Sequence, residues 1–190
     1  LRALDVAVGS GGGGGGGEVG GGGGVVAGSS VDNNDDDVIT TTTMMDAQNV
    51  SMTSWAYAKL GMKPRPESWD ALNEAWRRTS PEMKPQAVAN SVWACGTLGV
   101  TPEETARRAL FHDAALRETR NMKPQEISNL VWGYATLGDA PSSEIWREID
   151  AAVARTAPDM IAQGVSNTVW GYAKFERMPG VTTTRLRLDE

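Results

Sequence analysis

The sequence predicts an all-α fold, an α-solenoid of stacked helical hairpins with a period of about 38 residues. Three observations support this prediction. Four tryptophans are spaced 38, 39 and 38 residues apart, namely Trp55, Trp93, Trp132 and Trp170. Similar residues surround each of them, including a small residue directly after the ring. Apolar and small residues also recur at helical spacing on both sides of each tryptophan, as in an amphipathic helix.

The beginning of the chain differs from the rest in composition. Residues 1–44 contain glycine runs at 11–17 and 20–24. Such a segment buries little apolar surface and cannot offset the conformational entropy that its glycines would lose on folding. We therefore expect a disordered, Gly-rich, low-complexity segment at 1–44, a folded array at 45–180, and a truncated tail at 181–190.

The array divides into about three and a half repeats, with boundaries at 45–82, 83–121, 122–159 and 160–180. In the second repeat, Pro85 suits the first turn of a helix, because its missing N–H costs little there. Helical spacing continues from Gln86 to Leu98, and Gly99 is expected to end this first helix. The other repeats are expected to have equivalent first helices.

A second helix is expected to begin near Thr101, whose hydroxyl can cap it, and to end at about Thr119. Equivalent helices are expected at 67–78 and 142–153. Their arginines alternate with acidic residues, which is typical of a solvated outer face: Arg77, Arg78, Arg107, Arg108, Arg117, Arg120, Arg147 and Arg155. Each repeat is thus a helical hairpin.

Three sets of positions on the first helices are candidates for function. The tryptophans border the apolar arc, so we expect them to form a structural core, with base stacking as the alternative. A polar stripe beside them repeats Asn90, Asn129 and Asn167, whose amides either bond to the backbone of adjacent repeats or bind generically along a strand. The third set differs between copies and could read sequence, or be an unconstrained surface: Ala87, Ser91, Glu126, Leu130 and Thr168.

Two lysines could contact phosphate. Lys84 and Lys123 each precede a proline at the expected start of a first helix. Free N–H groups and the helix dipole attract anions at such a position. The alternative is a solvated lysine, since the outer copies have Asp46 and Ile161 at the corresponding positions.

Composition narrows the possible functions. The net charge is −6, but the first 45 residues hold six acids and one base, which leaves the remainder with 18 acids and 17 bases. This near-neutral balance is unusual for a nucleic-acid binder. With one histidine, His112, and one cysteine, Cys95, we expect no catalytic residues, no metal ligands and no cofactor. The sequence has no apolar run long enough to span a membrane, and we expect no small-molecule substrate.

The repeated motif, Gln-x-x-(Ser/Ala)-Asn-x-Val-Trp followed by small-aromatic-small residues, resembles the octotricopeptide repeats of algae and protists. It is also similar to the helical repeats of the FAST-kinase-like, leucine-rich family that often ends in a RAP domain. This resemblance implies a non-enzymatic RNA-binding factor in mitochondria or chloroplasts, acting on RNA processing, stability or translation. The chain opens on Leu1, so we expect an incomplete N-terminus in which no targeting peptide is visible.

The leading hypothesis is therefore binding of single-stranded RNA along the first helices, within a ribonucleoprotein complex. The candidate contacts are Lys84, Ala87, Asn90, Ser91, Lys123, Glu126, Asn129, Leu130, Asn167 and Thr168. The alternative is a protein-interaction scaffold that holds a peptide or helix in the same groove. Salt dependence separates the two, because RNA binding releases counterions.

Overall fold

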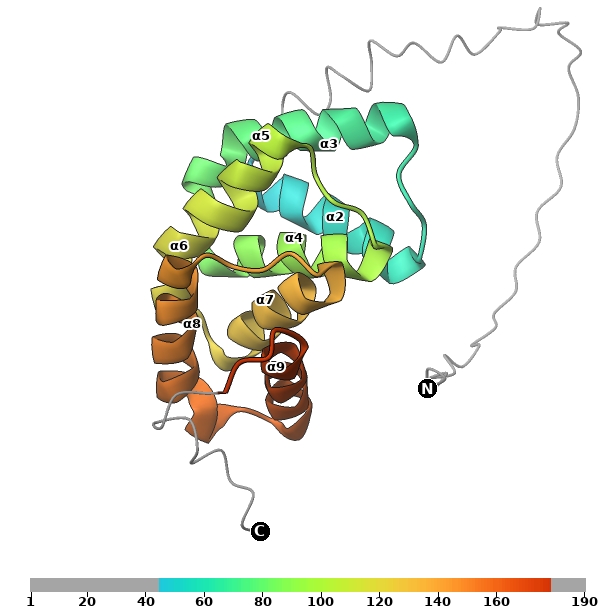
Figure 1. Cartoon of the computed structure of the whole chain (residues 1–190). Helices are drawn as coiled ribbons and strands as arrows, with labels where there is room; N and C mark the ends of the chain where they lie inside the picture. Colours follow the sequence, from blue (N-terminus) through green and yellow to red (C-terminus); the bar gives the residue numbers. More distant parts are fainter. Residues whose placement is uncertain (1–44, 179–190) are drawn as a thin grey trace, which may run out of the picture. The chain divides into compact units, whose positions relative to one another are not determined.

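Helix follows helix through the part of the chain that the structure, a computed structural model, describes: residues 45–178 (Figure 1). The helices are α2 (Ala47–Leu60), α3 (Pro66–Thr79), α4 (Pro85–Leu98), α5 (Glu104–Arg107), α6 (Ala115–Glu118), α7 (Pro124–Leu137), α8 (Ser143–Thr156) and α9 (Ala162–Lys174). A π-helical turn, Arg108–Ala114, joins α5 to α6. These residues contain no strand, so the all-α prediction is confirmed for them. The expected segments 1–44 and 181–190 lie outside the described residues.

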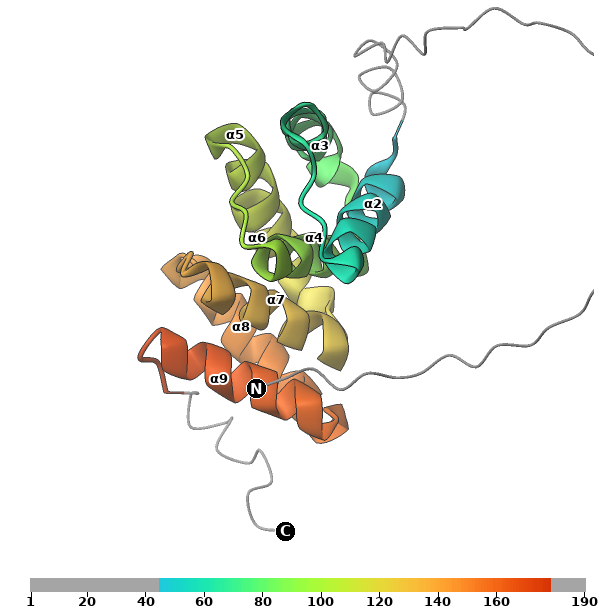
Figure 2. The same ribbon diagram turned by 90° about the vertical axis from the view of Figure 1, so that its right-hand side faces the viewer.

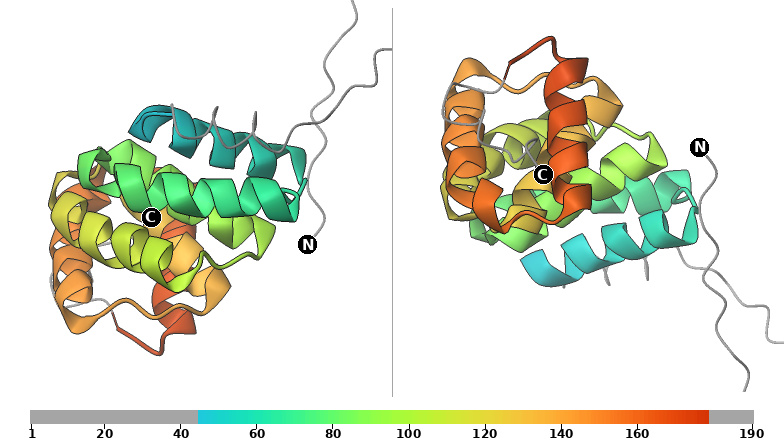
Figure 3. Two further views of the ribbon diagram at one scale, coloured as in Figure 1. Left: turned by 90° about the horizontal axis from the view of Figure 1, so that it is seen from above. Right: turned by 90° about the horizontal axis from the view of Figure 1, so that it is seen from below.

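The helices form two layers. In the first layer α2, α4, α7 and α9 lie side by side in chain order, and we name them the first-helix row. The second layer consists of α3, α5–α6 and α8, which pack against one side of that row (Figure 2). Helix direction turns along the first-helix row, so that α9, in red, runs steeply across the direction of α2, in blue (Figure 3).

Glycine ends three of the first helices. Gly61, Gly99 and Gly138 have φ of 65°, 62° and 70°, a left-handed conformation that only glycine adopts without strain. The backbone N–H groups of these glycines bond to carbonyl oxygens of the last turn. The predicted end of a first helix at Gly99 is therefore confirmed.

The second helix of the second repeat begins later than expected. Thr101 is not its cap, because α5 begins at Glu104. The backbone N–H of Glu103 donates instead to Oδ1 of Asn73, at 3.0 Å, so a side chain of α3 binds the chain just before α5. A contact between two hairpins thus replaces the local cap that the sequence indicated.

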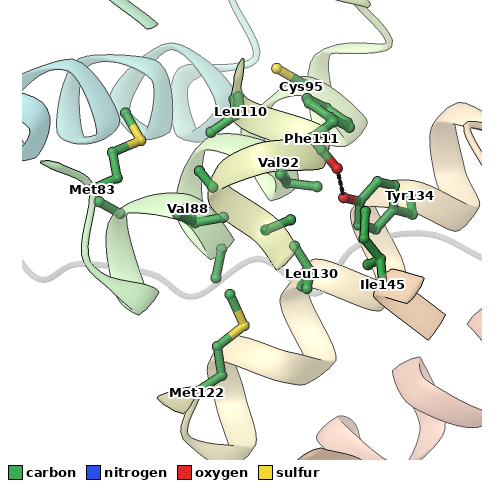
Figure 4. Packing of buried hydrophobic residues seen from close by; sticks show 14 of the residues in the cluster. Met83, Val88, Val92, Cys95, Leu110, Phe111, Met122, Leu130, Tyr134 and Ile145 are labelled. Atoms are coloured by element: carbon green, nitrogen blue, oxygen red, sulfur yellow. Dashed lines mark hydrogen bonds between the residues drawn. The ribbon is translucent and has the colours of Figure 1, made fainter. Parts of the chain in front are cut away.

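The core lies between the two layers and draws on both. Figure 4 shows Val88, Val92 and Leu130 of the first-helix row facing Leu110 and Ile145 of the second layer. Each of the five is at most 1% exposed. Burying such aliphatic side chains supplies about 1.5–3 kcal/mol each, which is the main force holding the layers together.

A tyrosine joins the layers near the π-helical turn. The hydroxyl of Tyr134 donates a hydrogen bond to the carbonyl oxygen of Phe111, and the two rings meet edge to face at 5.4 Å (Figure 4). Burial raises the pKa of Tyr134, which keeps its hydroxyl protonated as a donor. Cys95 occupies the corresponding position in α4 and is 1% exposed.

Close approach within the first-helix row depends on the small residues that follow tryptophan. A Cβ on Gly133 would lie 2.7 Å from the carbonyl oxygen of Val92, and one on Gly171 would collide with Val131. Neighbouring helices therefore approach closely at these positions. The backbones of α4, α7 and α9 meet where a side chain would otherwise separate them.

Candidate functional site

The side of the first-helix row that faces away from the second layer carries the same side chains on successive helices. Positions spaced i, i+4, i+7 and i+11 lie on one face of an α-helix. We name the resulting surface the repeat face: Gln48, Met52, Trp55 and Lys59 of α2; Gln86, Asn90, Trp93 and Thr97 of α4; Gln125, Asn129, Trp132 and Thr136 of α7; and Gln163, Asn167, Trp170 and Lys174 of α9. All sixteen residues are exposed or half-buried.

Two clefts open between the N-terminal halves of these helices. The cleft between α2 and α4 has a volume of about 740 Å³, and its lining includes Gln48, Gln86, Gln125, Asn90 and Lys84. The cleft between α7 and α9 has about 390 Å³ and is lined by Lys123, Asn129 and Asn167, among others. The structure therefore places Lys84 beside Asn90 in the first cleft, and Lys123 beside Asn129 and Asn167 in the second.

The four tryptophans are not the core that the sequence suggested. Trp93 and Trp132 are half-buried, whereas Trp55 and Trp170 are 39% and 41% exposed. The rings instead form a row along the surface, with centroid distances of 6.3 Å from Trp93 to Trp132 and 6.5 Å from Trp132 to Trp170. The largest fully buried side chain among the described residues is Trp76, which belongs to α3.

Lysines lie over this row of rings at both of its ends. Nζ of Lys59 lies 5.4 Å from the ring centroid of Trp55 and 5.9 Å from that of Trp93. Nζ of Lys174 lies 5.7 Å from the ring centroid of Trp170. Cation–π attraction of this kind holds an exposed ammonium in place beside an aromatic surface. The repeat face thus offers fixed positive charge, amides and indole edges.

Most of the positions that differ between copies cannot contact a ligand. Ser91, Leu130 and Thr168 were predicted to read sequence, but each is 0% exposed. Ala87 is also buried, although it lines the cleft beside α2. The physical reason is that a first helix has neighbours on two sides as well as the second layer beneath it. These positions point into contacts between helices, and the prediction that they read sequence is wrong.

Glu126 has a structural role. Its Oε2 accepts a hydrogen bond of 2.8 Å from the backbone N–H of Lys123, which satisfies a free donor at the start of α7. Asp46 likewise accepts a hydrogen bond from the backbone N–H of Asn49 at the start of α2. A carboxylate therefore already occupies the anion-binding end of these two helices. Lys84 and Lys123 are exposed beside the clefts.

Three arginines of the second layer bond to a backbone carbonyl oxygen at the start of their own hairpins, and two of them also bond to the end of the hairpin before. We name this set of contacts the carbonyl clamp. Nη2 of Arg117 donates to the carbonyl oxygens of Ser80 and Met83, at 2.9 and 3.1 Å. Nη2 of Arg155 does the same for Arg120 and Met122, at 3.0 and 2.8 Å. The equivalent Arg78 donates to the carbonyl oxygen of Met45, at 2.8 Å.

The expected solvated outer face holds for Arg77, Arg108, Arg120 and Arg147, which are exposed, but the expectation missed the carbonyl bonds of Arg78, Arg117 and Arg155. Arg107 departs from it too, because it makes a two-point ion pair with Asp139, at 2.8 and 2.6 Å. In the sequence, the recurrence of Arg78, Arg117 and Arg155 at intervals of 39 and 38 residues was the signal that could have identified the clamp.

Residues 1–120 match the family model described as "Tbc2 translation factor, N-terminal domain". The chain belongs to this family. No curated protein is significantly similar to it. Within the described residues, the Tbc2 N-terminal domain match includes α2 to α6, and so contains all the lining of the first cleft except Gln125, together with the clamp made by Arg117.

Residues 45–178 contain no group of three His, Cys, Asp or Glu side chains placed to hold a metal ion. Nδ1 of His112 lies 2.9 Å from the carboxylate of its neighbour Asp113, on the second layer. Over the same residues, no helix has the length and apolar character needed to cross a bilayer.

Proposed function

We propose that this chain binds single-stranded RNA along the repeat face and acts in organellar gene expression, in the translation, processing or stability of transcripts. The family's description as a translation factor supports a role in expression. The resemblance of the repeated motif to octotricopeptide repeats supports RNA as the ligand. The observation that carries the proposal is the alignment of equivalent amides and indole rings across four adjacent helices, with clefts beside them.

The α-solenoid with a period of about 38 residues is part of this proposal. Equivalent residues make equivalent contacts on successive helices, which is how a stacked array is built. Gly133 against Val92 is matched by Gly171 against Val131, one repeat later. The carbonyl clamp of Arg117 is likewise matched by that of Arg155.

The chemistry of the repeat face suits a flexible strand. Amide side chains both donate and accept hydrogen bonds, so they can pair with base edges, sugars or phosphate oxygens. Bases stack on aromatic rings with about 1–3 kcal/mol per base. Two lysines belong to the face, Lys59 and Lys174, and two more lie beside it, Lys84 and Lys123. Each neutralised phosphate contributes about −0.7 to the slope of log K against log salt concentration, so the four lysines supply at most about −2.8.

Binding of a protein segment is the second candidate, and the charge of the clefts favours it. Beside Lys84, the first cleft is lined by Asp46 and Glu82, and the second holds Asp159 beside Lys123. Acids thus equal or outnumber bases in both places. A protein ligand held there by apolar contacts would bind with little dependence on salt.

Fluorescence anisotropy of the 190-residue chain with a random pool of single-stranded RNA tests the proposal. We expect binding that weakens with added salt, and a slope reduced by about 1.4 in the double variant Lys84→Ala, Lys123→Ala. The matched control is Arg108→Ala, Arg147→Ala, which removes two exposed charges from the second layer and leaves the slope unchanged. Absence of RNA binding by the folded chain would overturn the proposal in favour of a protein ligand.

A further inference from the structure

The two ends of the first-helix row are complementary, and we propose that they bind each other in a head-to-tail association of two copies of this chain. Among the described helices, α2 and α9 have a neighbour in the row on one side only, whereas α4 and α7 have one on each side. We name the side of α2 or α9 without a neighbour its free side. In the association, the free side of α2 in one copy lies against the free side of α9 in the other.

The contact repeated inside the row shows what each free side would meet. It joins the residue before one tryptophan to the residue after the next. Gly133 of α7 lies against Val92 of α4, and Gly171 of α9 lies against Val131 of α7. The two valines are accordingly 0% and 1% exposed. At the place of these glycines α4 has Ala94, which is buried and packs against α2, so alanine also fits there.

The free side of α9 presents the first half of this contact, uncovered. Val169 precedes its tryptophan as the two buried valines do, yet it is 45% exposed. Ser166 and Ala173 lie on the same side of α9 and are also exposed. Their equivalents in α7, Ser128 and Ala135, are each 2% exposed, where α9 lies beside α7. A further helix of the row would therefore fit on this side of α9.

The free side of α2 presents the second half. Ala56 directly follows the tryptophan of α2, at the place of the buried Ala94, and it is exposed. Met52 and Leu60, one turn before and one turn after it, are 53% and 71% exposed. Leu98, the equivalent of Leu60, is only 7% exposed because it packs against α2. The free side of α2 thus resembles the surface with which α4 binds its own neighbour.

Because one chain carries both halves, a second copy is the occupant that fits. Ala56 of one copy lies on Val169 of the other, and Leu60 lies beside Ala173. A stacked array that stays alone needs polar surfaces at its ends, whereas the free sides here are apolar or small. The two surfaces differ from each other, so the association is heterologous and each pair keeps one free side of each kind.

The repeat face continues across this contact. Nζ of Lys59 lies 5.9 Å from the ring centroid of Trp93, so a lysine at this place on one helix reaches the tryptophan of the next. Lys174 has the same place on α9, and in the association it reaches Trp55 of the second copy. Two rows of first helices thereby become one row, with their tryptophans on the same side.

Sedimentation velocity of the 190-residue chain over a range of protein concentrations tests the inference. Salt at about 0.15 M screens the repulsion between exposed lysines of neighbouring copies. We expect the wild-type chain to sediment faster as its concentration rises. Ala56→Glu and Val169→Glu would each bury an unpaired carboxylate in the contact, so we expect each to raise the dissociation constant at least about tenfold. A wild-type chain that stays monomeric throughout the range would overturn the inference.

A mixture of the two variants gives the sharper measurement, because each retains the half of the contact that the other has lost. Ala56→Glu keeps its α9 surface and Val169→Glu keeps its α2 surface, so we expect an equimolar mixture to form pairs and nothing larger. Both residues are exposed, so both variants are expected to keep the fold, which circular dichroism checks.

The matched control is Ala151→Glu, which adds the same charge at an exposed place on α8 and should associate as the wild type does. Absence of pairs in the mixture would contradict the head-to-tail arrangement. Association of either variant alone, as strong as that of the wild type, would show that another surface is responsible and would also overturn the inference.

Discussion

Gly133 of α7 lies against the backbone of Val92 in α4, so closely that a methyl group on the glycine would stand 2.7 Å from the valine carbonyl oxygen. The nearest atom belongs to the backbone, which cannot rotate away as a side chain can. The spacing of the first-helix row at this point, and with it the spacing of the rings on the repeat face, therefore depends on the absence of a side chain.

Gly133→Ala should destabilise the protein. Alanine improves helix propensity by about 1 kcal/mol, but the clash with Val92 outweighs this gain, and we expect a net loss of about 1–3 kcal/mol in the free energy of unfolding. Urea denaturation measures it. Gly164→Ala is the matched control, because the nearest atom to its added methyl group would be 3.7 Å away. Equal stability of the two variants would contradict the role assigned to Gly133.

Arg155→Ala should weaken the connection between the third hairpin and the one before it. The side chain bonds two carbonyl oxygens through one nitrogen, and hydrogen bonds to charged groups contribute about 1.5–3 kcal/mol. Since Arg155 is largely exposed, we expect a loss near the lower value. Arg147→Ala, from the exposed side of the same helix, should change stability by less than about 0.5 kcal/mol. Similar losses in both variants would show that charge matters here and not the clamp.

Ser91→Ala should stabilise the protein and leave RNA binding unchanged. The Ser91 hydroxyl is buried and has no hydrogen-bond partner among the described residues, so its removal relieves a desolvation cost of about 1 kcal/mol. The control is Ser128→Ala, which removes a buried hydroxyl that donates to the carbonyl oxygen of Gln125, at 3.0 Å. Thermal denaturation and anisotropy measure the two effects. A clear loss of RNA affinity in Ser91→Ala would show that this side chain contacts the ligand and would contradict its assignment to the contact between helices.

Cys95 should resist thiol reagents in the native protein. Burial raises the pKa of its thiol well above the ordinary value, so the reactive thiolate is scarce at neutral pH, and access is blocked as well. We expect a disulfide reagent to label the folded chain slowly and the urea-unfolded chain at once. Because the chain has a single cysteine, the labelling rate also reports the opening of α4. Rapid, complete labelling of the native protein would show that this part of the core is accessible.

Trp132→Ala should destabilise the protein less than Trp76→Ala does. Trp76 is 0% exposed, and truncating a fully buried ring costs about 3–5 kcal/mol. Trp132 is only half-buried, so we expect less than half of that loss. Denaturant unfolding of both variants gives the comparison. A loss for Trp132→Ala as large as that for Trp76→Ala would show that the tryptophan row is part of the core.

Much of the fold could be predicted from the sequence, because helical periodicity and the glycines that end helices are local signals. Pro85 and Gly99 mark the two ends of α4 correctly. Which arc of a first helix is exposed could not be predicted in the same way. Projection of the sequence onto a helix assumes one buried side, whereas α7 has α4 and α9 beside it and the second layer beneath it. Only a narrow strip remains exposed, and it contains Trp132 and Asn129, whereas Leu130 is buried.

The size of the side chains held a signal that hydrophobicity alone did not show. Ala87, Ser91 and Gly164 are small, as expected where backbones meet closely. The role of Glu126 was also beyond the sequence argument, because a carboxylate three residues after a helix cap serves either the helix or a ligand. The bond from the backbone of Lys123 decides between the two.

The different residues buried along the first-helix row have a consequence for folding. In a chain of similar hairpins, any helix could pair with the wrong neighbour, and misassembly of this kind is a common failure of repeat proteins. Ser91, Leu130 and Thr168 differ in volume and polarity. Each of these helices therefore packs better against its own neighbour in the row than against the equivalent helix of another repeat. Divergence inside the row would thus guide each hairpin to its correct place during folding.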